Sequence, residues 1–214
     1  MKLIGMFDSP YVRRVAVTLK HLGIPFEHAN WSVGADFERI REFSPLGRVP
    51  VLVLDDGTAL VDSAAILDAI DDQVGPTRAL LPASGGSRRE ALRLISLAMG
   101  AGEKARDQLY ERMVRPPEKY HEPWVMRCRE QMHGALGLLE ATCRRRGPGT
   151  WLVDERLTQA DITVPCICTL LNDALDLFAD ASRYPALQAH VDRCERLPQF
   201  QATRSRWFAA RIGS

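Results

Sequence analysis

The chain has 214 residues, of which 46% are hydrophobic, and this composition predicts a folded globular protein with one large core or two modest ones. Its 28 basic and 27 acidic residues give a formal net charge of +1, so no overall field favours nucleic acid or anionic lipid as a partner. The apolar stretches at residues 3–7 and 162–172 are too short for a secretory signal or a membrane span, so we expect a cytoplasmic protein without membrane association.

The first 75 residues predict alternating strands and helices. An apolar strand over residues 2–7 precedes a helix from about 11 to 22 that ends at Gly23, and a second strand over 26–31 completes a βαβ unit. A helix-like stretch covers residues 36–43. Two short strands, 51–54 and 58–61, flank an Asp-Gly turn typical of hairpins, and a helix follows over 63–74. We therefore expect a small mixed sheet of about four strands.

The rest of the chain predicts helices alone. Residues 76–86 are rich in Gly, Pro and Ser and are typical of a linker, and long helices are expected over 88–115 and 123–146. Thr158 and Asp161 form a capping-box pattern before a helix over 162–171 that is apolar on nearly every face, with Pro165 inside it. The fold class is therefore α/β plus all-α, with an N-terminal domain over residues 1–75 and a helical bundle domain over 87–214.

Neither the cysteines nor the histidines form a metal-binding or catalytic pattern. The five cysteines are odd in number and Cys166 and Cys168 do not face each other on a helix, so we expect reduced structural thiols and no metal. The five histidines are scattered without ligand spacing, and phosphate-binding and catalytic-triad motifs are absent from the sequence. Metal hydrolysis, nucleotide hydrolysis and triad chemistry are therefore disfavoured.

Four blocks of sequence carry a family resemblance. They are Ser9-Pro10-Tyr11-Val12-Arg13, Pro45-Leu46-Gly47-Arg48-Val49-Pro50, Asp62-Ser63, and Trp151-Leu152 with Leu157-Thr158-Gln159-Ala160-Asp161-Ile162. Through them the chain resembles the cytosolic glutathione transferases, most of all their bacterial serine-type members. Each block alone is a weak signal, but the four in this order span both expected domains. The resemblance implies a thioredoxin-like N-terminal domain that binds glutathione as a co-substrate.

Ser9 is the expected catalytic residue. It precedes a helix whose unpaired amides and dipole favour a thiolate over a thiol, and its hydroxyl can donate a hydrogen bond to a bound sulfur. A free thiol of pKa about 8.5 is only about 3% ionised at pH 7, and a pKa lower by about two units raises this to about three quarters. The alternative interpretation is that Ser9 only caps the helix. Since positions 9 and 12 are Ser and Val, the nucleophilic sulfur has to arrive with glutathione.

The resemblance also implies the residues that bind glutathione. Pro50 is expected in the cis form, with the Val49 backbone pairing with the cysteinyl part of glutathione. Asp62 and Ser63 open a helix and suit the ammonium and carboxylate of the γ-glutamyl end, although simple helix capping is compatible with this role. Arg48 is similar to the basic residue that some family members direct at the glycine carboxylate.

The second substrate is expected to be a small electrophile beside two tyrosines, Tyr11 and Tyr110. Met99, Glu103 and Arg106 share the helical spacing of Tyr110, so packing explains these four positions equally well. The resemblance implies a homodimer and a role in detoxification. Two alternatives stay open: a glutathione-dependent isomerase, whose usual Ser-Ser-Cys motif is not matched here, and a non-catalytic interaction protein with the same fold.

Overall fold

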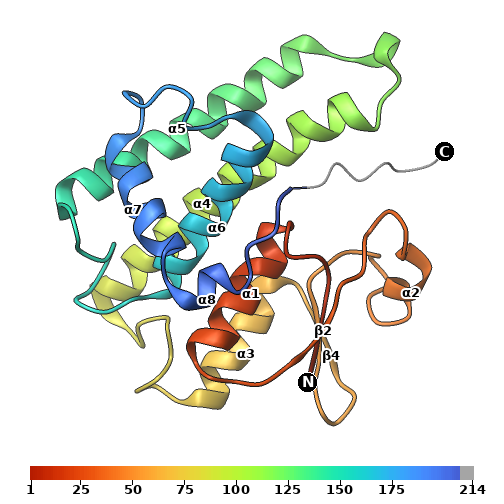
Figure 1. Ribbon diagram of the computed structural model, residues 1–214, viewed down its shortest axis with the longest axis vertical. Coiled ribbons are helices and arrows are strands. Elements are labelled where there is room, and N and C mark those ends of the chain that lie inside the picture. The colour runs from red at the N-terminus through yellow and green to blue at the C-terminus, as the bar shows by residue number, and fades with distance from the viewer. Residues whose placement is uncertain (208–214) are drawn as a thin grey trace. The chain divides into compact units, whose positions relative to one another are not determined.

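The computed structural model describes residues 1–207, which form two compact units. The first unit contains Met1–Ala83 together with residues 197–207, and the second contains Ser84–Arg196. Figure 1 shows the small sheet and its helices in the first unit and the long helices of the second. Within residues 1–207, no helix is both long and apolar enough to cross a membrane.

The first unit is built on a four-stranded mixed sheet with strand order β2-β1-β3-β4. β1 (Lys2–Ile4) pairs in parallel with β2 (Glu27–Ala29) and antiparallel with β3 (Val51–Val53), and β3 pairs antiparallel with β4 (Ala59–Val61). All four strands are shorter than the sequence predicts, but their order and directions confirm the expected thioredoxin-like sheet.

Helices α1 (Pro10–His21) and α3 (Ser63–Val74) of this unit pack against each other, and the short α2 (Phe37–Arg41) follows β2. A buried apolar cluster lies beside the sheet and joins strand residues to α2 through Ile4, Ala29, Ile40 and Val51. These elements match the helices expected over 11–22, 36–43 and 63–74.

The end of the described chain packs on α1. Residues from Leu197 include the short helix α8 (Pro198–Gln201). The Arg13 guanidinium, 2% exposed, donates a hydrogen bond from Nη2 to the Phe200 carbonyl at 3.1 Å and lies 5.7 Å from the centre of the Phe200 ring. A buried cation needs such partners. The division of the chain therefore differs from the expected helical domain of 87–214, because its last described residues join the first unit.

The second unit is all helical. Its elements are α4 (Gly85–Met113), a 3₁₀ turn η1 (Pro117–Lys119), α5 (Glu122–Arg146), α6 (Gln159–Leu175) and α7 (Pro185–Glu195). α4 packs against both α5 and α6, and α7 packs against α5 and α6. This confirms the expected helical bundle domain, in which α6 is buried along its first thirteen residues.

The capping box at the start of α6 is present. Asp161 is fully buried, and its carboxylate accepts hydrogen bonds from the Thr158 amide at 2.9 Å and hydroxyl at 2.8 Å and from the Leu152 amide at 2.8 Å. The helix begins at Gln159, directly after the cap, three residues earlier than the expected start.

All five cysteines are buried and none is assigned to a disulfide, as the sequence predicts for structural thiols. Burial raises the pKa of Cys143 to about 12 and also raises the pKa of Cys128, Cys168 and Cys194, so these thiols are not nucleophiles near neutral pH. Among residues 1–207, no three His, Cys, Asp or Glu side chains are grouped so that they could hold a metal ion.

Candidate functional site

The register of the sheet brings three of the predicted binding segments to the same end of its strands. At this end of the sheet, Ile4 of β1 pairs with Val51 of β3, and Val51 pairs with Val61 of β4. The next position beyond each paired residue is Gly5, Pro50 and Asp62, respectively. The loop that leads to Ser9, the Val49–Pro50 pair and the start of α3 therefore all lie at the same end of the sheet.

Gly5 allows two of these segments to approach each other. Its φ of +127° is one that side chains other than glycine rarely adopt. A methyl group at this position would lie 2.6 Å from Val12 Cγ2 and 2.8 Å from Val49 Cβ. Val12 in the first turn of α1 and Val49 before β3 therefore both pack against the bare α-carbon of Gly5. Gly5 was not among the predicted site residues, although a glycine directly after a strand is a signal for close backbone approach.

Ser9 occupies the N-cap position of α1, and its hydroxyl makes no capping hydrogen bond. Its backbone is extended, and its carbonyl accepts the Arg13 amide at 2.9 Å as the first bond of the helix. No acidic residue lies in the first turn of α1, so the positive end of the helix is not compensated there. Ser9 therefore caps the helix through its backbone, and its side chain does not make the capping hydrogen bond.

The Val49–Pro50 peptide bond is cis, as the family resemblance implies. Val49 is half-buried, Pro50 is buried and Arg48 is exposed. The preceding Gly47 has a φ of +60°, and the ring of Phe37 in α2 packs directly on it, because a methyl group there would lie 2.1 Å from a ring carbon. α2 therefore supports the loop that carries Arg48.

Asp62 and Ser63 start α3. Asp62 is exposed, has a φ of +72°, and accepts a hydrogen bond from the Ala64 amide to Oδ1 at 2.7 Å. It thus caps the helix, as the alternative interpretation expects, while its second carboxylate oxygen is not used by this bond. Ser63 is only 2% exposed, so its hydroxyl is largely covered and its backbone amide is the group at the helix terminus.

The residues expected around the second substrate belong to different units. Tyr11 lies in the first turn of α1, whereas Tyr110 lies in α4 with 43% of its surface exposed. Arg106, one turn before Tyr110, pairs with Asp107 at 3.2 Å. Met99 and Glu103 lie on the same helix.

A contact that was not predicted from the sequence supports the loop before Ser9. The rings of Phe7 and His28 stack in parallel, with centres 3.8 Å apart, and His28 Nε2 is hydrogen bonded to the Gly5 carbonyl at 2.8 Å. His28 in β2 thereby contacts both residues that flank Met6. No sequence spacing indicates this contact, because it joins residues more than twenty positions apart.

Family profiles match most of the chain. A profile described as the N-terminal domain of glutathione S-transferase matches residues 3–78, and one described as the C-terminal domain of glutathione S-transferase matches residues 107–198. Among curated proteins, the Escherichia coli protein described as an uncharacterized GST-like protein, YibF, is 30% identical over 178 residues, which covers 80% of this chain and 82% of YibF.

Solved structures agree with the profiles. A Methylobacillus flagellatus glutathione S-transferase with glutathione bound superposes with a TM-score of 0.86 at 27% identity, covering 94% of this chain and 98% of its own. A Pseudomonas fluorescens glutathione transferase family member with bound glutathione superposes with a TM-score of 0.82 at 31% identity, covering 95% and 98%.

Proposed function

The chain belongs to the glutathione S-transferase family, and from that premise we propose that it is a glutathione transferase in which Ser9 stabilises the glutathione thiolate for attack on a small electrophile. Bound glutathione in the two similar bacterial structures supports glutathione as the co-substrate. The observation that carries the proposal is the Ser9 hydroxyl, which lies at the N-terminus of α1 without a capping bond.

The chemistry of the step follows from this position. Glutathione binds as a thiol, its proton leaves to solvent, and the Ser9 hydroxyl donates a hydrogen bond to the resulting thiolate. The amide end of α1 adds positive potential because its first turn contains no carboxylate. The sulfur then forms a bond to an electrophilic carbon, which either releases a leaving group with the bonding electron pair or takes up a proton after addition.

Five further residues are proposed to hold glutathione, and their grouping at one end of the sheet supports this assignment. Val49 pairs through its backbone with the cysteinyl part, next to Pro50. Asp62 attracts the ammonium of the γ-glutamyl end, while the Ser63 amide at the start of α3 faces its carboxylate. Arg48, which is exposed, binds the glycine carboxylate.

Tyr11 and Tyr110 are proposed to contact the electrophile. A cytoplasmic location is supported by the five buried cysteines, none of which is assigned to a disulfide, because this fits a reducing compartment. The proposal also includes a homodimer and a role in detoxification. Light scattering, which measures the mass of the protein in solution, tests the dimer.

The test is calorimetric titration with glutathione at pH 7 in two buffers of different ionisation enthalpy, which counts released protons. A thiol pKa lowered by about two units predicts release of about 0.7 proton per glutathione bound. Ser9→Ala should release clearly less. Ser84→Ala is a matched control, because Ser84 is also an N-cap residue without a side-chain cap bond, but it starts α4. Absence of saturable binding, or equal proton release in the two variants, would overturn the proposal.

A further inference from the structure

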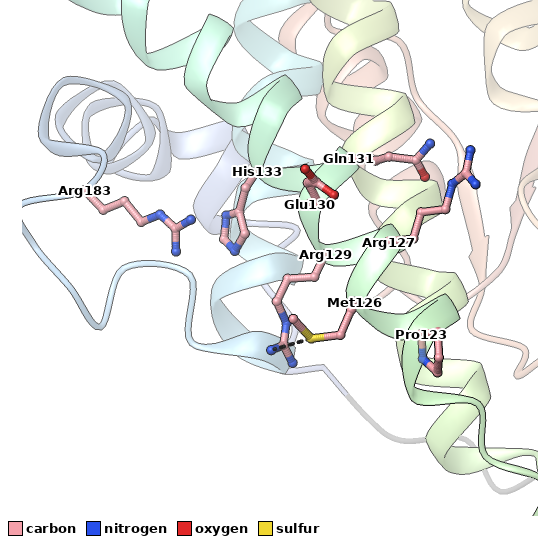
Figure 2. A pocket seen from close by; sticks show the side chains of 8 residues that line it. All are labelled: Pro123, Met126, Arg127, Arg129, Glu130, Gln131, His133 and Arg183. Atoms are coloured by element: carbon pink, nitrogen blue, oxygen red, sulfur yellow. Dashed lines mark hydrogen bonds between the residues drawn. The ribbon is translucent and has the colours of Figure 1, made fainter.

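The second unit contains a hollow on the outer side of α5. It has a volume of about 870 Å³, and residues of α5 line it together with Arg183 from the loop before α7. Figure 2 shows Arg183 extending towards His133, with Arg129 and Met126 on the same side of α5. None of the four belongs to the proposed glutathione site, which lies in the first unit.

Positive charge in this hollow is not neutralised by salt bridges. Arg127, Arg129 and Arg183 all line it, and within residues 1–207 none of them has a carboxylate oxygen within 4.0 Å. By contrast, Arg93 and Arg144 of the same unit are paired with glutamates at 2.8 Å and 3.0 Å. One acidic side chain, Glu130, also lines the hollow, which leaves an excess of two positive charges.

Tyr184 contacts two of the side chains in the hollow, Arg183 and His133, and fixes their orientations. The Arg183 guanidinium lies 5.5 Å from the centre of the Tyr184 ring, and the Tyr184 hydroxyl is hydrogen bonded to His133 Nδ1 at 2.9 Å. Tyr184 is itself buried, so it provides a fixed support. A guanidinium and an imidazole whose orientations are already fixed lose less conformational freedom when they bind a ligand.

The pKa of His133 reflects the positive charge around it. Burial lowers the pKa of His133, and the positive charges of Arg183 and Arg129 lower it further. The imidazole is therefore neutral near pH 7 and surrounded by uncompensated cations. Arg127, Glu130 and Tyr184 are further ionisable side chains that contact or line this region.

We propose that this hollow is a binding site for a phosphate monoester, whose dianionic oxygens contact Arg129, Arg183 and His133. A guanidinium can donate two parallel N–H hydrogen bonds to phosphate oxygens, and two guanidinium groups with one imidazole match the double negative charge and three terminal oxygens of a phosphate monoester better than a chloride ion or a single carboxylate. The organic part of the ester packs on Met126, which is 48% exposed and lines the same hollow. The site is separate from the thiol chemistry and needs no glutathione.

The probes are phenyl phosphate and inorganic phosphate, titrated into the full-length protein by calorimetry with chloride used to hold the ionic strength constant. Phenyl phosphate should bind saturably and more tightly than inorganic phosphate. Arg129→Gln and Arg183→Gln should each weaken its affinity about tenfold, as expected for loss of one charge-assisted contact. Arg112→Gln, which removes an exposed charge from α4 outside the hollow, should leave the affinity unchanged.

Three results would overturn the proposal. One is absence of saturation by either probe. Another is equal binding by Arg129→Gln, Arg183→Gln and the control. The third is displacement of phenyl phosphate by saturating glutathione, which would assign the binding to the Ser9 site. Light scattering on the arginine variants adds a further check: loss of a dimer without any phosphate binding would assign this face to a second copy of the chain and reject the ligand site.

Discussion

Replacement of Gly5 by alanine should damage both stability and glutathione binding, although Gly5 has no side chain that could contact a ligand. The new methyl group would meet Val12 at 2.6 Å and Val49 at 2.8 Å, and the φ of +127° is unfavourable for alanine. Backbone strain and overpacking together predict a loss of about 4 kcal/mol in the free energy of unfolding. Because Val49 has to move, its proposed pairing with glutathione should weaken as well.

Gly23→Ala separates the two causes. Gly23 also has a positive φ, +69°, but a methyl group there meets no atom within 4 Å, so only backbone strain of about 1 kcal/mol is expected. Urea unfolding and calorimetric titration with glutathione are measured on both variants. If Gly5→Ala unfolds at the same urea concentration as Gly23→Ala and binds glutathione normally, close packing at Gly5 does not hold the two loops together, and the reasoning fails.

Further predictions concern the buried polar groups. His190 is buried, with its Nε2 3.6 Å from Asp161 Oδ1, and burial, reinforced by Arg193, lowers its pKa to about 4. The unfolded chain therefore takes up this proton first, so about 3 kcal/mol of stability present above pH 6.5 is lost as the pH falls to about 4. His190→Gln should flatten this part of a pH series of urea unfolding curves, and an unchanged slope would contradict the assignment. The Asp71 carboxylate accepts the amides of Leu80 and Leu81 at 2.8 Å and 2.9 Å, so Asp71→Asn should lower the free energy of unfolding by about 2 kcal/mol, measured in the same assay. The five buried cysteines should react with a thiol reagent only at the rate of unfolding; rapid modification of the native protein would show that their burial is incomplete.

Local sequence signals predicted the helices and strands that have clear start or stop residues. The Asp-Gly turn joins β3 to β4, and Thr158 with Asp161 starts α6. Helices α7 and α8, which begin at Pro185 and Pro198, were not predicted. Both prolines lie in the first turn of their helices, where proline is favourable and the missing amide has no helical partner.

The candidate site was predictable only where its residues are contiguous in the sequence. Ser9, Val49 and Asp62 each belong to a short motif, and the register of the strands then places those motifs at the same end of the sheet. Contacts between distant residues gave no comparable signal. The stack of Phe7 on His28 and the support of Arg183 by Tyr184 beside α5 depend on how the chain folds back on itself, which spacing along the sequence does not indicate.

The contact between Arg13 and Phe200 has a consequence for biosynthesis. The two residues are 187 positions apart, so translation at ordinary rates separates their appearance by roughly 10 to 40 seconds. During that interval α1 has already been synthesised, but the carbonyl that accepts the hydrogen bond from Arg13 Nη2 has not yet been made. The unit that begins first is thus among the last to be completed, and a nascent chain halted before Phe200 lacks both the carbonyl and the ring that contact Arg13 in the finished protein.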